Sequence, residues 1–92
     1  WNLDQPDISY TAAIQDVVRI GRVVNDINID DETVSKKHCE LILRGQILYI
    51  KDVGSKNGTK HHNVRIDGEI SIASGEVVEI GRCRYRVVLD RK

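Results

Sequence analysis

The sequence predicts a small all-β domain, built as a sandwich or a barrel, and three observations support that fold class. Phe and Met are absent while hydrophobic residues make up 40% of the chain, so the core must come from Val, Ile and Leu. Val and Ile are stiff, β-branched residues that favour strands. In several short runs, apolar residues alternate with polar ones, as they do in half-buried strands. Gly and Asn interrupt these runs about every ten residues, a spacing typical of sandwiches and barrels.

The expected strands are short runs that end at turn residues. Val18 and Ile20 share one face of the first run, which ends at Gly21. The second run places Cys39 on one face with two leucines and stops just before Gly45. Residues 47–50 are apolar on both faces, which predicts a strand covered on both sides. Together, the expected strands occupy residues 18–20, 39–43, 47–50, 77–80 and 85–89.

Residues 31–43 also fit a helix. Acidic residues lead this segment, lysines follow, and Gly45 would lie just past its end. Several of its residues, among them Thr33 and Cys39, are poor helix formers, which weakens the helical interpretation. The local pattern leaves both alternatives open. In the helical alternative, one face would carry Val34, His38, Leu41 and Ile42.

The composition bounds the size of the domain and the class of its partners. Ninety-two residues suffice for one domain, which we expect to span residues 1–92. Because the chain starts at Trp1 and not at Met, we expect it to be excised from a longer protein. A formal net charge of zero, from 14 basic and 14 acidic side chains, argues against nucleic-acid binding. No apolar run approaches the ~20 residues of a membrane span, so we expect no membrane partner.

The cysteine content bears on the compartment. Cys39 and Cys83 are too few for a disulfide framework. Cys39 lies in an apolar alternation and is predicted to be a small buried hydrophobe. No signal-peptide pattern opens the chain. We therefore expect a reducing, intracellular location, either cytoplasmic or nuclear.

Polar residues with hydrogen-bond donors gather at the predicted strand ends and in the loops between them. Such loops are where recognition residues are usually found on a rigid scaffold. The donors comprise a guanidinium, hydroxyls, an amide and ammonium groups, and several are cationic. Converging donors suit a dianionic ligand with many acceptors, such as a phosphate. They occur in Gly21-Arg22, in residues 35–38, in residues 55–59 and at Asn63.

Catalytic and metal sites fit the sequence less well. Asp26 opens a calcium-loop pattern, but the sixth and twelfth positions hold Asp31 and Lys37 in place of Gly and Glu. His61 and His62 are adjacent, so on a strand they would point to opposite faces and would not chelate one ion. The residues around Ser35 and His38 lack a nucleophile elbow. We therefore predict no enzyme activity, no catalytic residue, no metal and no cofactor.

Four short motifs, taken in order and at their spacing, resemble the forkhead-associated (FHA) domain family. They cover residues from about 18 to 88. The resemblance implies a sandwich of about eleven short strands, SMAD/FHA-like, with loops at one end that bind phosphothreonine peptides. It also favours a loop over residues 31–37 and a strand over residues 38–43. The motifs are Gly21-Arg22, Ser35-x-x-His38, Ser55-x-Asn57-Gly58-Thr59 with Asn63 beyond it, and the closing segment 75–81.

The resemblance implies a role for each binding residue. Arg22 would form charge-assisted bonds to the phosphate, and Ser35 would donate its hydroxyl to it. Lys36 stands where the family often places a second donor. Lys56 occupies a variable position of its loop, close to the phosphothreonine. Asn57 would hold the peptide backbone just after the phosphothreonine.

Other residues would support these loops. Gly21 belongs to the first motif, and His38 would brace the binding loops from within, without a catalytic role. Gly58 and Thr59 would shape a tight turn. Asn63 would tie neighbouring loops together. Arg82, which also follows a glycine, lies outside the family's binding pattern and is interpreted as an exposed residue at a strand end.

The predicted function is that of a phosphothreonine-peptide-binding module for phosphorylation-dependent protein–protein interaction in signalling. Its partner would be a phosphothreonine-containing protein or peptide, and the domain itself is expected to be monomeric. The alternative is an FHA-like scaffold that contacts a partner, or another domain of its own chain, without phosphate. In that case Arg22→Ala would leave partner capture intact.

Overall fold

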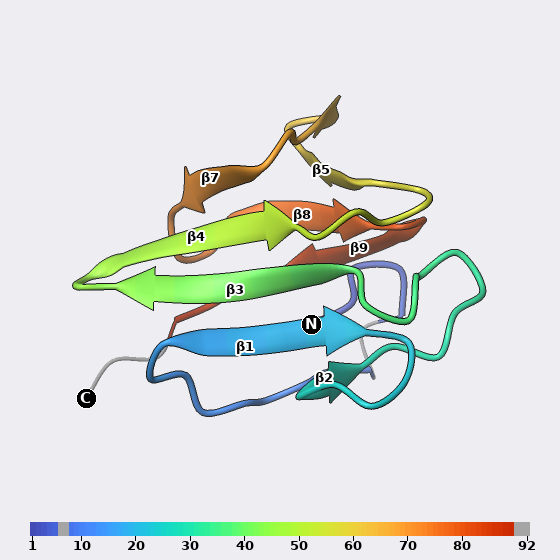
Figure 1. Ribbon diagram of the computed structural model, residues 1–92, viewed down its shortest axis with the longest axis horizontal. Coiled ribbons are helices and arrows are strands. Elements are labelled where there is room, and N and C mark those ends of the chain that lie inside the picture. Colours follow the sequence, from blue (N-terminus) through green and yellow to red (C-terminus); the bar gives the residue numbers. More distant parts are fainter. Residues whose placement is uncertain (6–7, 90–92) are drawn as a thin grey trace.

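The computed structural model describes residues 1–5 and 8–89, which form two β-sheets packed face to face (Figure 1). The described residues contain no helix, which confirms the all-β sandwich prediction. No helix that could cross a membrane is found among them. Residues 31–37 form a loop and the next residues form a strand, so the helical alternative for residues 31–43 is wrong.

The first sheet has five strands in the order β2-β1-β3-β4-β7. Its pairings are antiparallel except for the short parallel pair of β1 and β2. The longest ladder joins β3 to β4 through a hairpin that turns at Gly45. The strands are β1 (Val17–Gly21), β2 (Ile27–Asn28), β3 (Cys39–Arg44), β4 (Ile47–Asp52) and β7 (Glu69–Ile72).

The second sheet has four antiparallel strands in the order β6-β5-β8-β9. Nine strands are thus present in the described residues, fewer than the eleven that the FHA resemblance implied. The described residues before β1 and after β9 contribute no ladder, and Asn2 and Tyr85 form only an isolated bridge. The strands of this sheet are β5 (Thr59–His61), β6 (Val64–Arg65), β8 (Val77–Ile80) and β9 (Cys83–Arg86).

The core lies between the sheets and consists of aliphatic residues, as the composition predicted. Val18 and Ile20 are both buried, and Cys39 is only 1% exposed, which confirms its prediction as a buried hydrophobe. Cys39 and Cys83 are both free thiols. The prediction that residues 47–50 are covered on both sides is wrong at one end. Ile47 pairs with Arg44 beside the hairpin turn, where no other element covers its outer face, and it is 51% exposed.

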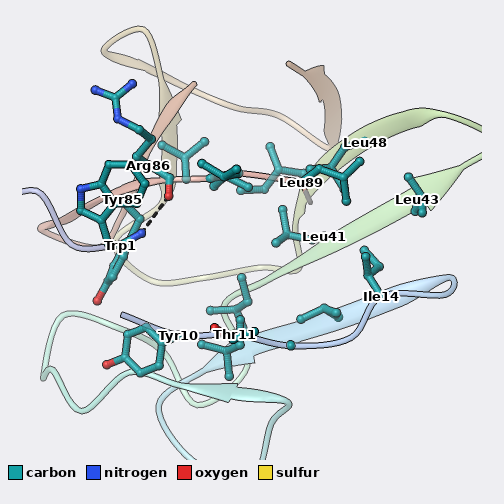
Figure 2. A pocket seen from close by; sticks show the side chains of 18 of the residues that line it. Trp1, Tyr10, Thr11, Ile14, Leu41, Leu43, Leu48, Tyr85, Arg86 and Leu89 are labelled. Atoms are coloured by element: carbon teal, nitrogen blue, oxygen red, sulfur yellow. Dashed lines mark hydrogen bonds between the residues drawn. The ribbon is translucent and has the colours of Figure 1, made fainter. Parts of the chain in front are cut away.

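Part of the space between the sheets is hollow. An apolar cavity of about 920 Å³ extends from the core to the tip of the β3–β4 hairpin. Figure 2 shows Ile14, Leu41, Leu43 and Leu89 around this hollow. Leu41 and Leu43 are only partly buried because the cavity is open to solvent. We call it the apolar hollow.

Candidate functional site

The loops that carry the predicted donors meet at one end of the sandwich. Strand β3 begins where β4 ends, at the pair Cys39 and Asp52, and β5 begins beside the end of β8, at the pair Thr59 and Ile80. Strand β1 ends on the same side, on the right of Figure 1. We call this the loop end and define it as residues 21–38, 52–59 and 81–82. Every predicted site residue except Asn63 belongs to it.

Gly21 brings the end of β1 into direct contact with the following loop. A Cβ at this position would lie 2.1 Å from the carbonyl oxygen of Lys36, so only glycine fits. The next residue, Arg22, donates its backbone N–H to the carbonyl of Ser35 at 3.0 Å. The close approach therefore positions Arg22 beside Ser35 and Lys36.

His38 joins two loops from inside the protein. Its ring is fully buried, and Nδ1 accepts a hydrogen bond from the backbone N–H of Ser35 at 3.0 Å. Because Nδ1 is an acceptor, the ring proton lies on Nε2, which donates to the carbonyl of Gly58 at 2.8 Å. His38 thus links residue 35 to residue 58, and its ring is not accessible to a substrate.

Ser35 connects the same two loops at the surface. Its Oγ accepts the backbone N–H of Lys56 at 3.0 Å. The Ser35 hydroxyl proton is donated to no residue in the described part of the chain. This hydroxyl is therefore oriented by the protein and still able to donate to an external acceptor.

Asp52 organises the loop from residue 52 to residue 59, a role that the sequence analysis missed. It accepts the backbone N–H groups of Gly54 and Ser55, each at 2.9 Å. It also accepts the hydroxyls of Ser55 and Thr59, both of which are buried. Burial alone would raise the pKa of Asp52, but the hydrogen bonds from Ser55, Thr59 and Gly54 outweigh it and hold the pKa below its ordinary value. The Asp-x-x-Ser spacing of an Asx turn was the signal that could have found it.

Asn57 and Gly58 complete the turn above Asp52. Gly58 has a φ of +88° and donates its N–H to Ser55 Oγ at 3.0 Å. A Cβ on Gly58 would lie 2.8 Å from Nε of Arg65. The side-chain amide of Asn57 donates to the carbonyl of Thr33 at 2.8 Å. Its Oδ1 accepts no hydrogen bond within residues 1–5 and 8–89, so this oxygen can still accept one from a ligand.

The cations at the loop end fall into two groups. Arg22, Lys36, Lys37 and Lys56 form no side-chain hydrogen bond and no ion pair with any residue that the structure describes. Arg82, in contrast, donates from Nε to Asp31 Oδ2 at 3.0 Å. Asp31 is held by Thr33, whose hydrogen bonds, with a smaller effect from Arg82, lower the pKa of Asp31 to about 2. The loop end therefore offers four cations without an ion-pair partner, and three of them, Arg22, Lys36 and Lys56, belong to residues whose backbone adjoins Ser35.

The structure does not bring Asn63 into this cluster, although we expected it to tie loops together. Asn63 and His62 are the two central residues of the β5–β6 turn, with φ values of 64° and 52°. The Asn63 side chain forms no hydrogen bond with a described residue. The same turn corrects the expectation that His61 and His62 point to opposite faces. Their rings lie 3.9 Å apart and both contact Glu76.

Comparisons with known proteins point to one family. The model of the FHA domain matches residues 18–81. The chain is 42% identical over 60 residues to the glycogen accumulation regulator GarA of Mycolicibacterium smegmatis. That match covers 65% of this chain and only 37% of the relative.

Solved structures agree with this match. One, from a structural and functional analysis of phosphothreonine-dependent FHA domain interactions, superposes with a TM-score of 0.85 at 26% identity. It covers 99% of this chain and 94% of that one. The FhaA FHA domain, complexed with the intracellular domain of Rv3910, gives a TM-score of 0.79 at 27% identity, with 90% and 91% covered.

Proposed function

The chain belongs to the FHA domain family, and from this premise we propose that its loop end binds phosphothreonine peptides and so mediates phosphorylation-dependent protein–protein interaction. The observation that carries the proposal is the set of three unpaired cations on residues that adjoin an oriented hydroxyl. The phosphate of phosphothreonine carries a charge of about −1.5 to −2 at neutral pH and presents three acceptor oxygens. The unpaired cations and the Ser35 hydroxyl are complementary to it in charge and in hydrogen bonding.

Each residue of the cluster has a proposed part in binding. Arg22 forms charge-assisted hydrogen bonds to the phosphate, which suit the planar guanidinium fork. Ser35 donates its hydroxyl proton to a phosphate oxygen. Lys36 and Lys56 contribute positive charge from either side. Asn57 accepts a backbone N–H of the peptide just after the phosphothreonine through its free Oδ1.

The magnitudes indicate that the phosphate is necessary for binding but not sufficient. A hydrogen bond to a charged group contributes roughly 1.5–3 kcal/mol, so three contribute about 5–9 kcal/mol before association costs. Micromolar affinity requires about 8 kcal/mol net. Contacts with residues flanking the phosphothreonine therefore supply the remaining affinity and the sequence preference.

The bracing of the loops lowers the cost of binding. Hydrogen bonds donated by the side chains of His38 and Asn57, and those accepted by Asp52, already hold the loops that carry the donors. A preorganised site loses little conformational entropy when a peptide binds. The ring of His38 is buried and forms a hydrogen bond at each of its two nitrogens, which supports a bracing role. The proposed function is therefore binding and not catalysis.

The decisive experiment compares the affinities of one peptide, with and without its phosphate, for the wild type and for two arginine variants. We would select a sequence from an oriented phosphothreonine library and titrate it, with and without its phosphate, by isothermal calorimetry. Arg22→Ala should weaken binding by about 10- to 100-fold, the loss of one charged hydrogen bond or slightly more. Arg82→Ala is the matched control, since its guanidinium is paired with Asp31, and it should change affinity by less than about threefold.

Two results would reject the proposal. One is equal affinity of the wild type for the phosphorylated and unphosphorylated peptides. The other is a folded Arg22→Ala variant, judged by its thermal midpoint, that binds the phosphopeptide as well as the wild type does. Either result would favour the scaffold alternative, in which a partner is contacted without phosphate.

A further inference from the structure

A second cluster of polar side chains lies away from the loop end, where β5 leaves it and turns into β6. His61 ends β5, His62 lies in the β5–β6 turn, and Glu76 immediately precedes β8. The register pairs His61 with Val78, which places the three residues two positions or more from the loop-end pair of Thr59 and Ile80. They come from two chain segments that the sheet pairing brings together.

The three side chains converge on one point. Nε2 of His61 lies 2.9 Å from Oε2 of Glu76, and Nε2 of His62 lies 3.0 Å from the same oxygen. All three ligand atoms lie within 4.8 Å of one another. We propose that His61, His62 and Glu76 form a zinc-binding site, with two imidazole nitrogens and one carboxylate oxygen as ligands.

The backbone of the turn makes this convergence possible. On a regular strand, neighbouring side chains point to opposite faces. His62 leaves the strand in the left-handed region, with a φ of 52°, and its ring turns back beside that of His61. Two-residue hairpin turns with two positive φ values favour Asn and Gly, and histidine, although it tolerates a positive φ better than most residues, is not the usual residue at the first position. Metal ligation would provide a reason for an imidazole at this position.

Glu76 is held in an orientation suitable for a ligand. Its Oε1 accepts the backbone N–H of Ala73 at 2.6 Å, so Oε2 is the oxygen that faces both imidazoles. A second hydrogen bond of this kind is the usual way that proteins orient a ligating carboxylate. The side chains of His61 and Glu76 are 14% and 28% exposed, whereas His62 is 74% exposed. The cluster is thus preformed on its inner side and accessible to a metal ion on its outer side.

The chemistry of the ligands fits zinc. Imidazole nitrogen binds Zn²⁺ at about 2.0–2.1 Å and carboxylate oxygen at about 2.0–2.2 Å, usually in a tetrahedron. Tetrahedral ligand atoms are then about 3.3 Å apart, so the observed N···O distances of 2.9 and 3.0 Å need to open by only a few tenths of an ångström. On binding, Zn²⁺ replaces the proton on each Nε2, and a ring that was neutral takes up a proton on Nδ1 from solvent in exchange, so that each ligand is a neutral imidazole; a water completes the fourth position.

A bound zinc ion would connect the β5–β6 hairpin to the β7–β8 connection. Because zinc would bind the folded protein only, it would raise the thermal midpoint in a concentration-dependent way. For a domain of this size we expect saturating zinc to raise the midpoint by about 4 °C or more. The proposal does not depend on phosphopeptide binding, because none of the three residues belongs to the loop end.

The test uses the untagged protein, titrated with ZnCl₂ and followed by histidine ring NMR signals and by thermal unfolding. The ring signals of His61 and His62 should shift, and that of the buried His38 should not. His62→Gly removes one ligand and relieves the unfavourable φ, so it should fold at least as well as the wild type without metal. This variant and Glu76→Gln should lose at least about tenfold in zinc affinity.

Asn63→Gly is the matched control, because it changes the same turn and keeps all three ligands, so its zinc affinity should equal that of the wild type. Absence of a midpoint rise and of ring-signal shifts in the wild type would overturn the proposal. Zinc binding of equal strength in the wild type and His62→Gly would overturn it too, because the ion would then bind elsewhere. Unchanged phosphopeptide affinity of His62→Gly would show that the variant is folded.

Discussion

At the loop end, buried polar side chains join loops that are distant in the sequence, whereas toward the β3–β4 hairpin an open apolar cavity of about 920 Å³ extends outward from the core. The first region is held by hydrogen bonds with defined directions, and the second by incomplete apolar packing. Directional bonds position donors for a ligand, while apolar contacts do not specify one geometry. The difference indicates that side-chain positions are fixed most strictly at the loop end, where the phosphate would bind.

The largest expected effect, because it combines a loss of stability with the loss of phosphopeptide binding, concerns glycines at the two ends. Gly21→Ala places a methyl group 2.1 Å from the carbonyl oxygen of Lys36, and neither backbone can yield easily. We expect a loss of about 3 kcal/mol in the free energy of unfolding, together with the loss of phosphopeptide binding. Gly45→Ala, in the β3–β4 turn, meets no atom within 4 Å and should cost only about 1 kcal/mol for its positive φ. Urea unfolding measures both, and equal losses would remove the distinction between the ends.

The next effect in size is the difference in stability loss when a carboxylate is removed at each end. Asp52→Ala leaves the hydroxyls of Ser55 and Thr59 without their acceptor and should lower the free energy of unfolding by about 2–4 kcal/mol. Glu69→Ala breaks the exposed ion pair with Arg44 near the hairpin and should cost about 0–1 kcal/mol. Chemical denaturation of both variants tests this. A loss below about 1 kcal/mol for Asp52→Ala would show that its hydrogen bonds do not stabilise the loop end.

The apolar hollow itself should tolerate truncation. Leu43→Ala removes a side chain that is already in contact with an open cavity, so we expect a loss of about 1 kcal/mol. Ile50→Ala, at a fully buried position on the wall of the same hollow, should cost about 2–5 kcal/mol because it removes a side chain with buried contacts on all sides. Thermal unfolding, monitored by circular dichroism, measures the loss of stability in each of the two variants. If Leu43→Ala were as costly as Ile50→Ala, the hollow would be closed in solution.

The smallest effect is a pH dependence at the loop end. The pKa of Asp31 is lowered to about 2, so its ionised form stabilises the folded protein at pH values above the ordinary Asp pKa. This stabilisation should decline as the pH falls from about 4 to about 2. Asp31→Asn keeps the acceptor for Thr33 but removes the charge, so its thermal midpoint should fall less over this interval. Parallel acid dependence in the two proteins would assign the effect to other carboxylates.

The strands were largely predictable because burial follows the apolar pattern. Val18 and Ile20 share a buried face, and the run beginning at Cys39 is a strand, as the FHA resemblance implied. Ile47 was mispredicted because periodicity does not indicate whether another element covers the second face. The nine strands described are fewer than the eleven expected, and the segment that begins at Trp1 pairs with β9 only through an isolated bridge of Asn2 and Tyr85.

The site was predictable where motifs mark it. The structure brings Arg22, Ser35, Lys36, Lys56 and Asn57 to one end, and it shows that Arg82 is engaged by an acid. Asp52 was missed because its importance lies in four hydrogen bonds that exist only in the folded loop. Asn63 was misplaced, and His61 and His62 were misjudged, because a turn with two positive φ values redirects side chains that the strand rule would separate.

By itself, the sequence determined the all-β class, the family and the donor residues, because alternating burial and local motifs depend on residue type and spacing. Only the tertiary structure decided which cations remain unpaired, because Arg22 and Arg82 both follow a glycine, yet folding brings an acid, Asp31, beside Arg82 and none into an ion pair with Arg22 among the described residues. It also decided that the two imidazoles share Glu76, a contact between residues 14 or 15 positions apart in the chain. Such contacts follow from sheet register and turn geometry, which no local pattern specifies.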